Sequence, residues 1–178
     1  MRTELRTQRL LLRPFGAADV DDALAYRDDA EFARYLPQVP QPFSRRDAEV
    51  FVARNISEPW DRSPTFAVVL DGTVVGTVNF EIDAEKKSAM LGYAFGRAWW
   101  GQGFAIEAVR AAVSWAVPTF SLRRLWASTD KRHRRSRRLL EELGMEPEVI
   151  RERDHVGREG DLVDEVVYGI DLEILRQT

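Results

Sequence analysis

The chain has 178 residues, 26 of them basic and 29 acidic, for a net charge of −3. This length fits one domain, and the acidic balance argues against a chain built to coat nucleic acid. It has no cysteine and only two histidines, His133 and His155, which excludes disulfide scaffolds and thiolate nucleophiles and argues against a metal centre. The charged first residues resemble no signal peptide, and no apolar run could span a bilayer, so we expect a cytoplasmic protein.

The first quarter of the chain predicts a strand and two helices. The run Leu-Leu-Leu-Arg-Pro at 10–14 indicates a strand closed by proline. Apolar residues at helical spacing predict a helix over 19–35, and the prolines that follow it impose an extended loop. Ser44 has the position and chemistry of an N-cap for a second helix.

The remaining chain predicts a hairpin and then alternating elements. Two β-branched runs, 65–70 and 73–80, flank the turn dipeptide Asp71-Gly72. Later elements are expected as strand, helix, strand, helix and two final strands at 89–95, 102–117, 123–129, 134–143, 148–156 and 164–172. This order predicts a single α/β (mixed α+β) domain spanning 1–178, built on a mixed sheet.

A glycine-rich turn between a predicted strand and a predicted helix is the most informative segment. It reads Gly-x-Gly-x-Ala over 101–105. Small residues allow a ligand close to the backbone, and the free N–H groups at a helix start favour an anion. Neither a Walker loop nor a complete dinucleotide fingerprint is present. On this turn alone, glycines required only for packing remain an equal alternative.

The segment Trp100 to Ala105 resembles the acyl-CoA-binding motif of the GNAT acetyltransferases, Gln/Arg-x-x-Gly-x-Gly/Ala, with tryptophan in the first position. The form Trp-Gly-Gln-Gly-Phe-Ala-x-Glu-Ala resembles the RimJ/RimL branch of that family. Further segments resemble the same branch in the same order: 5–14, 91–93, 139–145 and 160–168. The resemblance implies a GNAT fold, with a twisted mixed sheet whose central strands splay at a bulge between flanking helices.

The resemblance also implies how acetyl-CoA is bound as co-substrate. The pantetheine arm is expected to pair with the backbone of Phe95, Gly96 and Arg97. The pyrophosphate is expected on the backbone N–H groups of Gln102, Gly103, Phe104 and Ala105. A direct attack of an amine on the bound thioester then requires positioning, a proton acceptor and a proton donor.

A basic run, Lys131 to Arg138, carries six positive charges in eight residues. It fits a solvated helix face, a contact to the CoA phosphates or an arginine-rich RNA contact, and we favour a mixture of the first two. The run matches the family pattern Asn-x-x-Ser, with His133 at the asparagine position of the CoA contact and Ser136 at the serine. By this resemblance Ser136 protonates the departing thiolate. The alternative is a helix-start hydroxyl bonded to its own backbone.

The general base is not readable at the position where many relatives carry glutamate, because that residue here is Met90. The resemblance points instead to Asp154 and His155 ahead of the last hairpin loop, acting through water. Imidazole titrates near neutral pH, which suits this role. The alternative, which the position favours, is that both belong to an ordinary edge-strand surface. Glu81 is a further candidate, Glu107 fits a structural role better, and a water chain could replace any single base.

These features predict an N-acetyltransferase acting on a primary amine of a protein N-terminus, an aminoglycoside-like antibiotic or another small molecule. By family analogy the segment 28–43 forms one wall of the acceptor site. Its acidic residues Asp28, Asp29 and Glu31 could attract a cationic amine, or could be a solvated helix end.

Two other functional classes remain open from the sequence. Met90 and His133 depart from the family pattern, and a non-catalytic acyl-CoA sensor or interaction module would tolerate both changes. RNA binding through the basic run is the third class. Because RimL-like proteins pair, the resemblance and the crowd of aromatic residues at 93–100 also lead us to expect a homodimer, although core packing would explain these aromatics equally.

Overall fold

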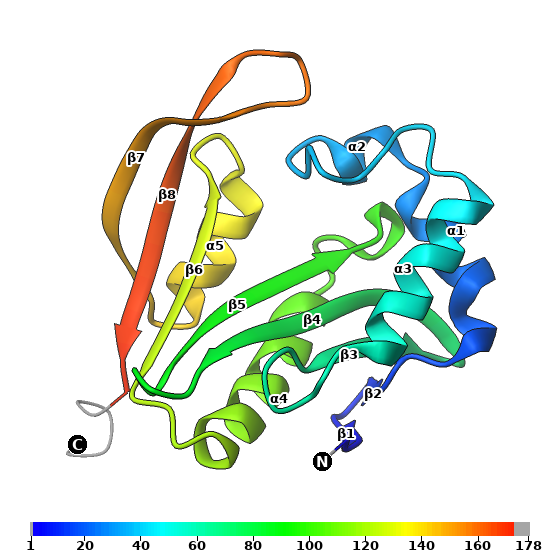
Figure 1. The fold of residues 1–178 in the computed structure, drawn as a ribbon, viewed down its shortest axis with the longest axis horizontal. Helices are drawn as coiled ribbons and strands as arrows, with labels where there is room; N and C mark the ends of the chain where they lie inside the picture. The colour runs from blue at the N-terminus through cyan, green and yellow to red at the C-terminus, as the bar shows by residue number, and fades with distance from the viewer. Residues whose placement is uncertain (1, 173–178) are drawn as a thin grey trace.

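A computed structural model describes residues 2–172 as one twisted sheet with helices on both faces (Figure 1). The strands follow the order β1-β2-β3-β4-β5-β6-β8-β7. Their bounds are β1 Leu5–Arg6, β2 Leu11–Arg13, β3 Thr65–Leu70, β4 Thr73–Asp83, β5 Ser88–Phe95, β6 Arg124–Asp130, β7 Glu146–Val156 and β8 Leu162–Asp171. The α-helices are α1 Val20–Arg27, α2 Ala30–Ala33, α3 Arg45–Ser57, α4 Phe104–Thr119 and α5 Arg134–Glu142, and the 3-10 helices are η1 Ala17–Asp19 and η2 Arg97–Trp99.

The sheet is mixed, as the sequence predicted. Strands β1 to β5 form an antiparallel meander, and α4 crosses over to β6, which is parallel to β5. This parallel pairing covers only three residue pairs, from Ser88–Arg124 to Met90–Trp126. Figure 1 shows the two strands diverging beyond that point. The expected splay is therefore present, but the expected bulge is not, because β5 stays in register with β4 from Ser88 to Phe95.

Two apolar clusters hold the elements together. The larger joins the sheet to α4 and includes the fully buried side chains of Phe66, Phe80 and Leu125. The smaller lies between the opposite face of the sheet and helices α1 and α3, around Phe43 and Val52. Burial of this kind of surface contributes about 25 cal/mol per Å². The two clusters fix both walls of the opening between β5 and β6.

One predicted element is wrong in detail. The helix expected over 19–35 is divided into η1, α1 and α2, because Asp28 and Asp29 interrupt it. Oδ1 of Asp29 accepts a hydrogen bond from the N–H of Phe32 at 2.9 Å, and Oδ1 of Asp28 accepts one from the N–H of Phe43 at 2.8 Å. Aspartate side chains that bond nearby backbone compete with helix continuation.

The predicted start of α3 is confirmed. Oγ of Ser44 accepts a hydrogen bond from the N–H of Asp47, whose carboxylate in turn accepts from the N–H of Ser44. This reciprocal arrangement is a capping box. The aromatic residues at 93–100 find internal partners: Nε1 of Trp100 donates to the carbonyl of Phe95, and Trp99 packs against both apolar clusters. Core packing accounts for them, so they are no evidence for an oligomer surface.

No helix within residues 2–172 has the length and apolar character required to cross a membrane.

Candidate active site

The divergence of β5 from β6 leaves a stretch of strand backbone without a neighbouring strand. The N–H of Gly96 donates to the carbonyl of Val75 in β4, and antiparallel partners alternate along a strand. The backbone groups of Leu91, Tyr93 and Phe95 therefore point away from β4, toward the side where pairing with β6 has ended. This edge can pair with an extended ligand in the way that a further strand would.

The glycine-rich turn lies at the end of this strand edge and begins α4. Gly101 and Gly103 have φ values of +75° and +80°, which favour glycine. The N–H groups of the four residues proposed to hold the pyrophosphate have no backbone partner within the described chain: Gln102, Gly103, Phe104 and Ala105. The first backbone hydrogen bond of α4 runs from the N–H of Glu107 to the carbonyl of Gly103. Free donors and the helix dipole make this turn suitable for an anion.

The glycine-rich turn is held in place by Arg9 and Glu107. Nη1 of Arg9 donates to the carbonyl of Gln102, and its guanidinium covers the Phe104 ring at 4.4 Å. The Glu107 carboxylate accepts from Nε and the backbone N–H of Arg9, at 2.7 and 2.9 Å, and from the Thr7 hydroxyl at 2.6 Å. Burial raises the pKa of Glu107, but these hydrogen bonds lower it by a larger amount, so the pKa lies below its usual value. Glu107 is thus structural, as the sequence suggested.

Several of the backbone groups expected to contact pantetheine have partners inside the chain, and the contact itself stays a prediction. The carbonyl of Phe95 accepts from Trp100, and the N–H of Gly96 donates to Val75. The carbonyl of Arg97 accepts from the N–H of Trp100 at 3.2 Å, and its side chain separately pairs with Asp29 at 2.9 Å. Tyr93 lies two residues before Phe95 in β5, and its backbone N–H and carbonyl have no neighbouring strand on the β6 side. These two groups are better placed to bind a ligand than those of Phe95, and the sequence analysis did not identify them.

Ser136 lies at the start of α5 and faces β5. Its side chain is buried, and its Oγ is 2.9 Å from the phenolic oxygen of Tyr93. Tyr93 also donates to the backbone carbonyl of Ser136 at 3.1 Å. Burial raises the pKa of Tyr93 to about 12, against the opposing effect of the Ser136 hydrogen bond. A protonated phenol and a hydroxyl therefore stand together beside the opening between β5 and β6.

His133 precedes α5, and its ring stacks on Tyr35 with 4.3 Å between ring centroids. Burial lowers the pKa of His133 to about 4, and Arg135 adds to this against the opposing charge of Asp130. The imidazole is consequently neutral near pH 7. It joins the loop after α2 to the loop before α5 across the opening, and the CoA contact that the sequence suggested for His133 stays a prediction.

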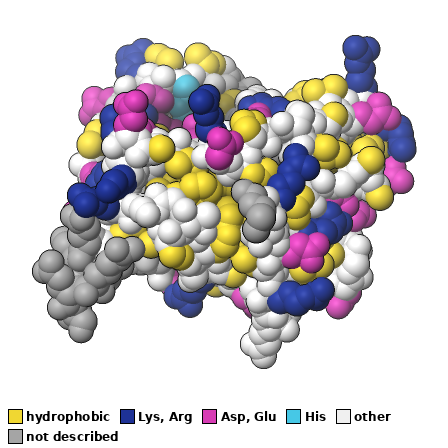
Figure 2. Space-filling model, turned by 60° about the horizontal axis from the view of Figure 1, so that its bottom comes forward, with side chains coloured by type: hydrophobic (Ala, Val, Ile, Leu, Met, Phe, Trp, Pro, Cys, Tyr) yellow, Lys and Arg dark blue, Asp and Glu magenta, His cyan; other side chains and the backbone are white. Residues whose placement is uncertain are grey.

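The basic run divides into bound and available arginines. Arg132 forms ion pairs with Asp130 and Asp161, and Nε of Arg137 donates to the hydroxyl of Tyr168. Arg135 covers the Trp100 ring at 4.4 Å and thus lies beside the glycine-rich turn. Figure 2 shows positive and negative side chains interspersed over the visible face, without a broad basic patch. This arrangement fits the mixture of a solvated helix face and a phosphate contact.

A cavity of about 910 Å³ opens between the diverging strands. One wall is the loop after α2, with Tyr35 to Pro40 and Phe43, as expected for the segment 28–43. The sheet contributes Glu81, Met90 and Gly92, and α5 contributes Ser136. The acidic residues expected to attract an amine do not line it: Asp28 and Asp29 are bonded locally, and Glu31 pairs with Arg34. For these residues the helix-end interpretation holds.

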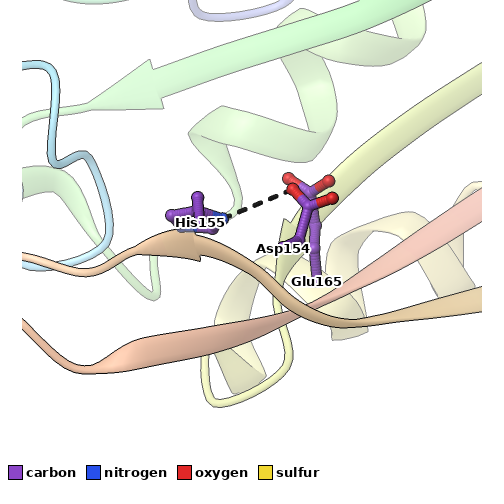
Figure 3. Close-up of side chains that lie close together, drawn as sticks. All are labelled: Asp154, His155 and Glu165. Atoms are coloured by element: carbon purple, nitrogen blue, oxygen red, sulfur yellow. Dashed lines mark ion pairs between the residues drawn. The ribbon is translucent and has the colours of Figure 1, made fainter.

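The acidic side of the cavity comes from β7 and β8 instead. The cavity is lined there by Asp154, His155 and Glu165. One carboxylate oxygen of each acidic residue and one ring nitrogen of His155 lie within 4.8 Å of one another. Figure 3 shows the carboxylates of Asp154 and Glu165 side by side, with the His155 ring directed toward them. Nδ1 of His155 is 3.6 Å from Oδ2 of Asp154, and Glu165 also contacts Arg151 at 3.4 Å.

This trio of Asp154, His155 and Glu165 can accept a proton or stabilise a cation. The sequence indicated two of its members, and Glu165 was missed because it lies ten residues away along the chain, in the next strand. In the sequence, Glu165 is one polar residue in an alternating strand pattern, and nothing in that pattern indicates a functional role. The pairing of His155 with Val163 across the hairpin is what brings β8 alongside.

Residues 9–146 match the family of the acetyltransferase (GNAT) domain. The chain belongs to this family. The expected fold and the expected enzyme class, an acetyl-CoA-dependent N-acetyltransferase, are thereby confirmed. The family match spans β2 to β5, the glycine-rich turn, α4, β6 and α5, which include the strands on both sides of the opening.

Individual relatives agree with the RimJ/RimL resemblance. An N-acetyltransferase of Bacillus licheniformis named p20, described as uncharacterized, is 29% identical over 169 residues, covering 93% of this GNAT chain and 94% of the relative. The [ribosomal protein uS5]-alanine N-acetyltransferase of Escherichia coli is 32% identical over 77 residues, 42% of this chain and 40% of the relative. The structure of RimL, the ribosomal L7/L12 α-N-protein acetyltransferase, with coenzyme A shares the fold with a TM-score of 0.85 at 18% identity, covering 95% of this chain and 98% of that one.

Proposed function

We propose that this protein transfers the acetyl group of acetyl-CoA to a primary amine by direct attack within the 910 Å³ cavity. One observation carries the proposal. The free edge of β5 runs from the anion-binding turn at α4 to the hydroxyl pair of Tyr93 and Ser136. An extended acyl-CoA with its pyrophosphate on the turn would present its thioester near Ser136. The solved RimL complex contains coenzyme A, which supports this choice of co-substrate.

The chemistry requires one bond to form and one to break. The amine nitrogen attacks the thioester carbonyl, a C–N bond replaces the C–S bond, and the products are an acetamide and CoA. Ser136 donates its hydroxyl proton to the departing sulfur while Tyr93 donates to Oγ of Ser136, and Tyr93 regains a proton from solvent, which in turn receives the proton lost by the amine. The side chains position and neutralise charge, and the thioester itself supplies the reactivity.

The ammonium proton is removed on the opposite side of the cavity. Asp154, His155 and Glu165 form the proton-accepting group, acting directly or through water. Their combined charge also attracts the cationic amine before it loses its proton. Glu81 lines the cavity as well and is the second candidate for this step.

The acceptor is a primary amine of a small molecule or of a peptide end. One relative, the Escherichia coli enzyme, is named a [ribosomal protein uS5]-alanine N-acetyltransferase, which supports a protein N-terminus as one class. A homodimer remains part of the proposal, and four of the large exposed apolar side chains lie on the β7–β8 hairpin: Val149, Ile150, Val156 and Leu162. Light scattering at tens of micromolar tests it, and a monomer mass would overturn it.

Steady-state release of CoA thiol across a panel of amines tests the transfer reaction, with mass detection of the acetylated product. The panel contains N-terminal peptides, aminoglycosides, diamines and amino acids. Turnover of at least one amine supports the proposal. Tight acetyl-CoA binding without turnover of any amine would favour the acyl-CoA sensor instead.

A further inference from the structure

Arg27, the last residue of α1, is a cation enclosed by aromatic rings. Only 9% of the residue is exposed. Its guanidinium carbon lies 3.9 Å from the centroid of the Phe51 ring, and further rings surround it at 5.2 Å (Phe43), 5.4 Å (Phe32) and 5.9 Å (Tyr26). Aromatic faces stabilise a cation, but they leave the N–H groups at the edge of the guanidinium without acceptors.

The Tyr26 hydroxyl lies close enough to the Arg27 guanidinium to influence the pKa of Tyr26, but not in the geometry of a hydrogen bond. Nε of Arg27 is buried without a hydrogen-bond partner, and no carboxylate within residues 2–172 forms an ion pair with this guanidinium. The following residues, Asp28 and Asp29, direct their carboxylates to the backbone of Phe43 and Phe32. A buried charge without a counter-charge lowers the stability of the fold. An apolar side chain of similar volume would fill the same space without this cost, which argues that the charge of Arg27 has a function.

Two comparisons indicate that the arrangement is particular to this place. Arg13, close by, pairs with the buried carboxylate of Asp19 at 2.7 Å. The second buried polar atom without a partner in the described residues is the hydroxyl of Tyr26, the residue before Arg27. Burial raises the pKa of Tyr26, so its hydroxyl keeps its proton and remains a donor. Nε of Arg27 and the hydroxyl of Tyr26 are therefore two adjacent buried donors that no group within residues 2–172 meets in hydrogen-bond geometry.

Arg27 lines the same cavity as the Asp154, His155 and Glu165 trio. The trio projects from β7 and β8, and Arg27 projects from α1, on the other side of the opening (Figure 1). The α3 carboxylates on the Arg27 side are engaged, Asp47 in the capping box and Glu58 with Arg54, so Arg27 is the charge there without an ion-pair partner in the described chain. A ligand that matches both sides is a zwitterion, with an amine at one end and an oxyanion at the other.

We infer that Arg27 is a specificity residue that binds an oxyanion, a carboxylate or a phosphate, on the acceptor amine. This inference rests on the proposed acetyl transfer and deepens it by naming the acceptor class: primary amines that carry a carboxylate or a phosphate on the same small molecule. A guanidinium binds either oxyanion through paired N–H donors. An N-terminal peptide lacks such a group near its amine and would not use Arg27.

The test uses three matched series of acceptors with acetyl-CoA and the full chain. The first is ω-amino carboxylates of two to six carbons, the second their primary amides, and the third ω-aminoalkyl phosphates. We expect kcat/KM to be at least about tenfold higher for the best oxyanion acceptor than for its neutral match, with an optimum chain length set by the span of the cavity. A preference in the first series assigns a carboxylate, and one in the third a phosphate. Equal rates for charged and neutral matches would overturn the inference, as would turnover of N-terminal peptides alone.

Three variants localise the effect. Arg27→Met keeps the volume and loses the charge, and it should lower kcat/KM about tenfold or more for oxyanion acceptors while leaving the neutral amides and the acetyl-CoA KM unchanged. Arg27→Lys should restore part of the preference. Arg54→Met is the control, because Arg54 lines the same cavity but is exposed and pairs with Glu58. An equal loss for charged and neutral acceptors would make Arg27 structural. If Arg27→Met does not fold, the comparison of acceptors with the unaltered chain still decides.

Calorimetry separates this inference from the transfer reaction. The probe is the best ω-amino carboxylate, titrated into the protein loaded with CoA, which cannot acetylate it. Binding that Arg27→Met weakens about tenfold, without turnover of any amine, would sustain the oxyanion site and refute the transferase. Turnover of neutral amines together with no Arg27-dependent binding would refute the oxyanion site and sustain the transferase.

Discussion

The phenolic oxygen of Tyr93 lies 2.9 Å from Oγ of Ser136, so that the hydroxyls of β5 and α5 meet where the strands diverge. Tyr93 can donate to Oγ or to the carbonyl of Ser136, but not to both at once through its one proton. Only the first choice leaves the Ser136 proton free for a thiolate. The pair therefore behaves as a unit in which the phenol orients the serine.

Replacing this pair should affect turnover more than binding. We expect Ser136→Ala to lower kcat about 10²-fold, the low end for acid catalysis because a thiolate leaves readily. The acetyl-CoA Kd should stay within about twofold. Tyr93→Phe should lower kcat in the same direction by less. Single-turnover rates together with calorimetric Kd values provide the measurement.

The double variant Ser136→Ala/Tyr93→Phe is the control for this coupling. Because residues that act as a unit are non-additive, it should be no slower than Ser136→Ala alone. Strictly additive losses would show that the phenol acts independently. A weakened acetyl-CoA affinity with an unaltered kcat would make Ser136 a binding residue.

The glycine-rich turn provides a matched pair of substitutions. A Cβ at Gly103 would lie 3.3 Å from Nη2 of Arg9, whereas a Cβ at Gly101 meets nothing within 4 Å. Both residues have positive φ, so valine strains the backbone at either place. We expect Gly103→Val to raise the acetyl-CoA Kd at least about tenfold, or about 1.4 kcal/mol, and Gly101→Val to raise it much less. Calorimetry compares them, and equal Kd values would refute the pyrophosphate assignment.

The proton-accepting trio should reveal itself through pH. Glu165→Gln and Asp154→Asn should each lower kcat/KM, by up to about 10²-fold for the true base. The loss should shrink as the pH approaches the pKa of the acceptor amine, because free amine then needs no base. Glu152→Gln, on the exposed side of β7, is the control. A loss that is constant across the pH range would assign these residues to positioning alone.

Much of this architecture is readable in the sequence, since local signals fix it. The capping box at Ser44, the Asp71-Gly72 hairpin and the small residues of the glycine-rich turn each act over a few residues. Their order along the chain carries the family resemblance. The structure adds the length of the β5–β6 pairing, which joins residues 36 positions apart and is therefore not set by a local pattern.

The missed site residues share one property: each acquires its role from a partner distant in the chain. Tyr93 meets Ser136 43 residues later, and Arg27 is enclosed by rings that come from α2, the following loop and α3. An arginine at the end of a helix is ordinary in a sequence, and only its enclosure distinguishes it. Glu165 likewise gains significance only beside Asp154 and His155.

Glu107 should stabilise the fold in a pH-dependent way. Its pKa in the folded protein is depressed, so its contribution is present above the unfolded value of about 4.3 and is lost as the pH falls through the folded value. We expect Glu107→Gln to reduce the free energy of unfolding by about 1–2 kcal/mol at pH 7 and by less near pH 3. Denaturant titrations at both pH values measure this difference.

Glu142→Gln is the matched control for Glu107. Glu142 pairs with Arg110 at 3.6 Å, and both side chains are more than half exposed. Exposed pairs contribute little, so this variant should unfold like the parent protein at either pH. If Glu107→Gln also had no effect on the free energy of unfolding, the hydrogen bonds between Arg9 and Glu107 would not stabilise the glycine-rich turn.

His133 should likewise lose stability on acidification, but in a higher pH range than Glu107. Burial lowers its pKa to about 4 in the folded protein, against about 6.5 in an unfolded chain. Between these values the unfolded chain binds the proton and the folded chain does not, so stability is fully present above pH 6.5 and falls toward pH 4. The loss amounts to about 2–3 kcal/mol, because each pKa unit corresponds to about 1.4 kcal/mol.

His133→Asn isolates this contribution. Asparagine cannot titrate, and it removes the stack on Tyr35 at every pH, which adds a constant offset. The difference in unfolding free energy between the parent and His133→Asn should therefore change steadily from pH 7 to pH 4.5, in favour of the variant. NMR of the imidazole should show His133 still neutral at pH 5.5. Parallel stability curves, or a ring that protonates near pH 6.5, would place His133 in solvent and remove it from the wall of the cavity.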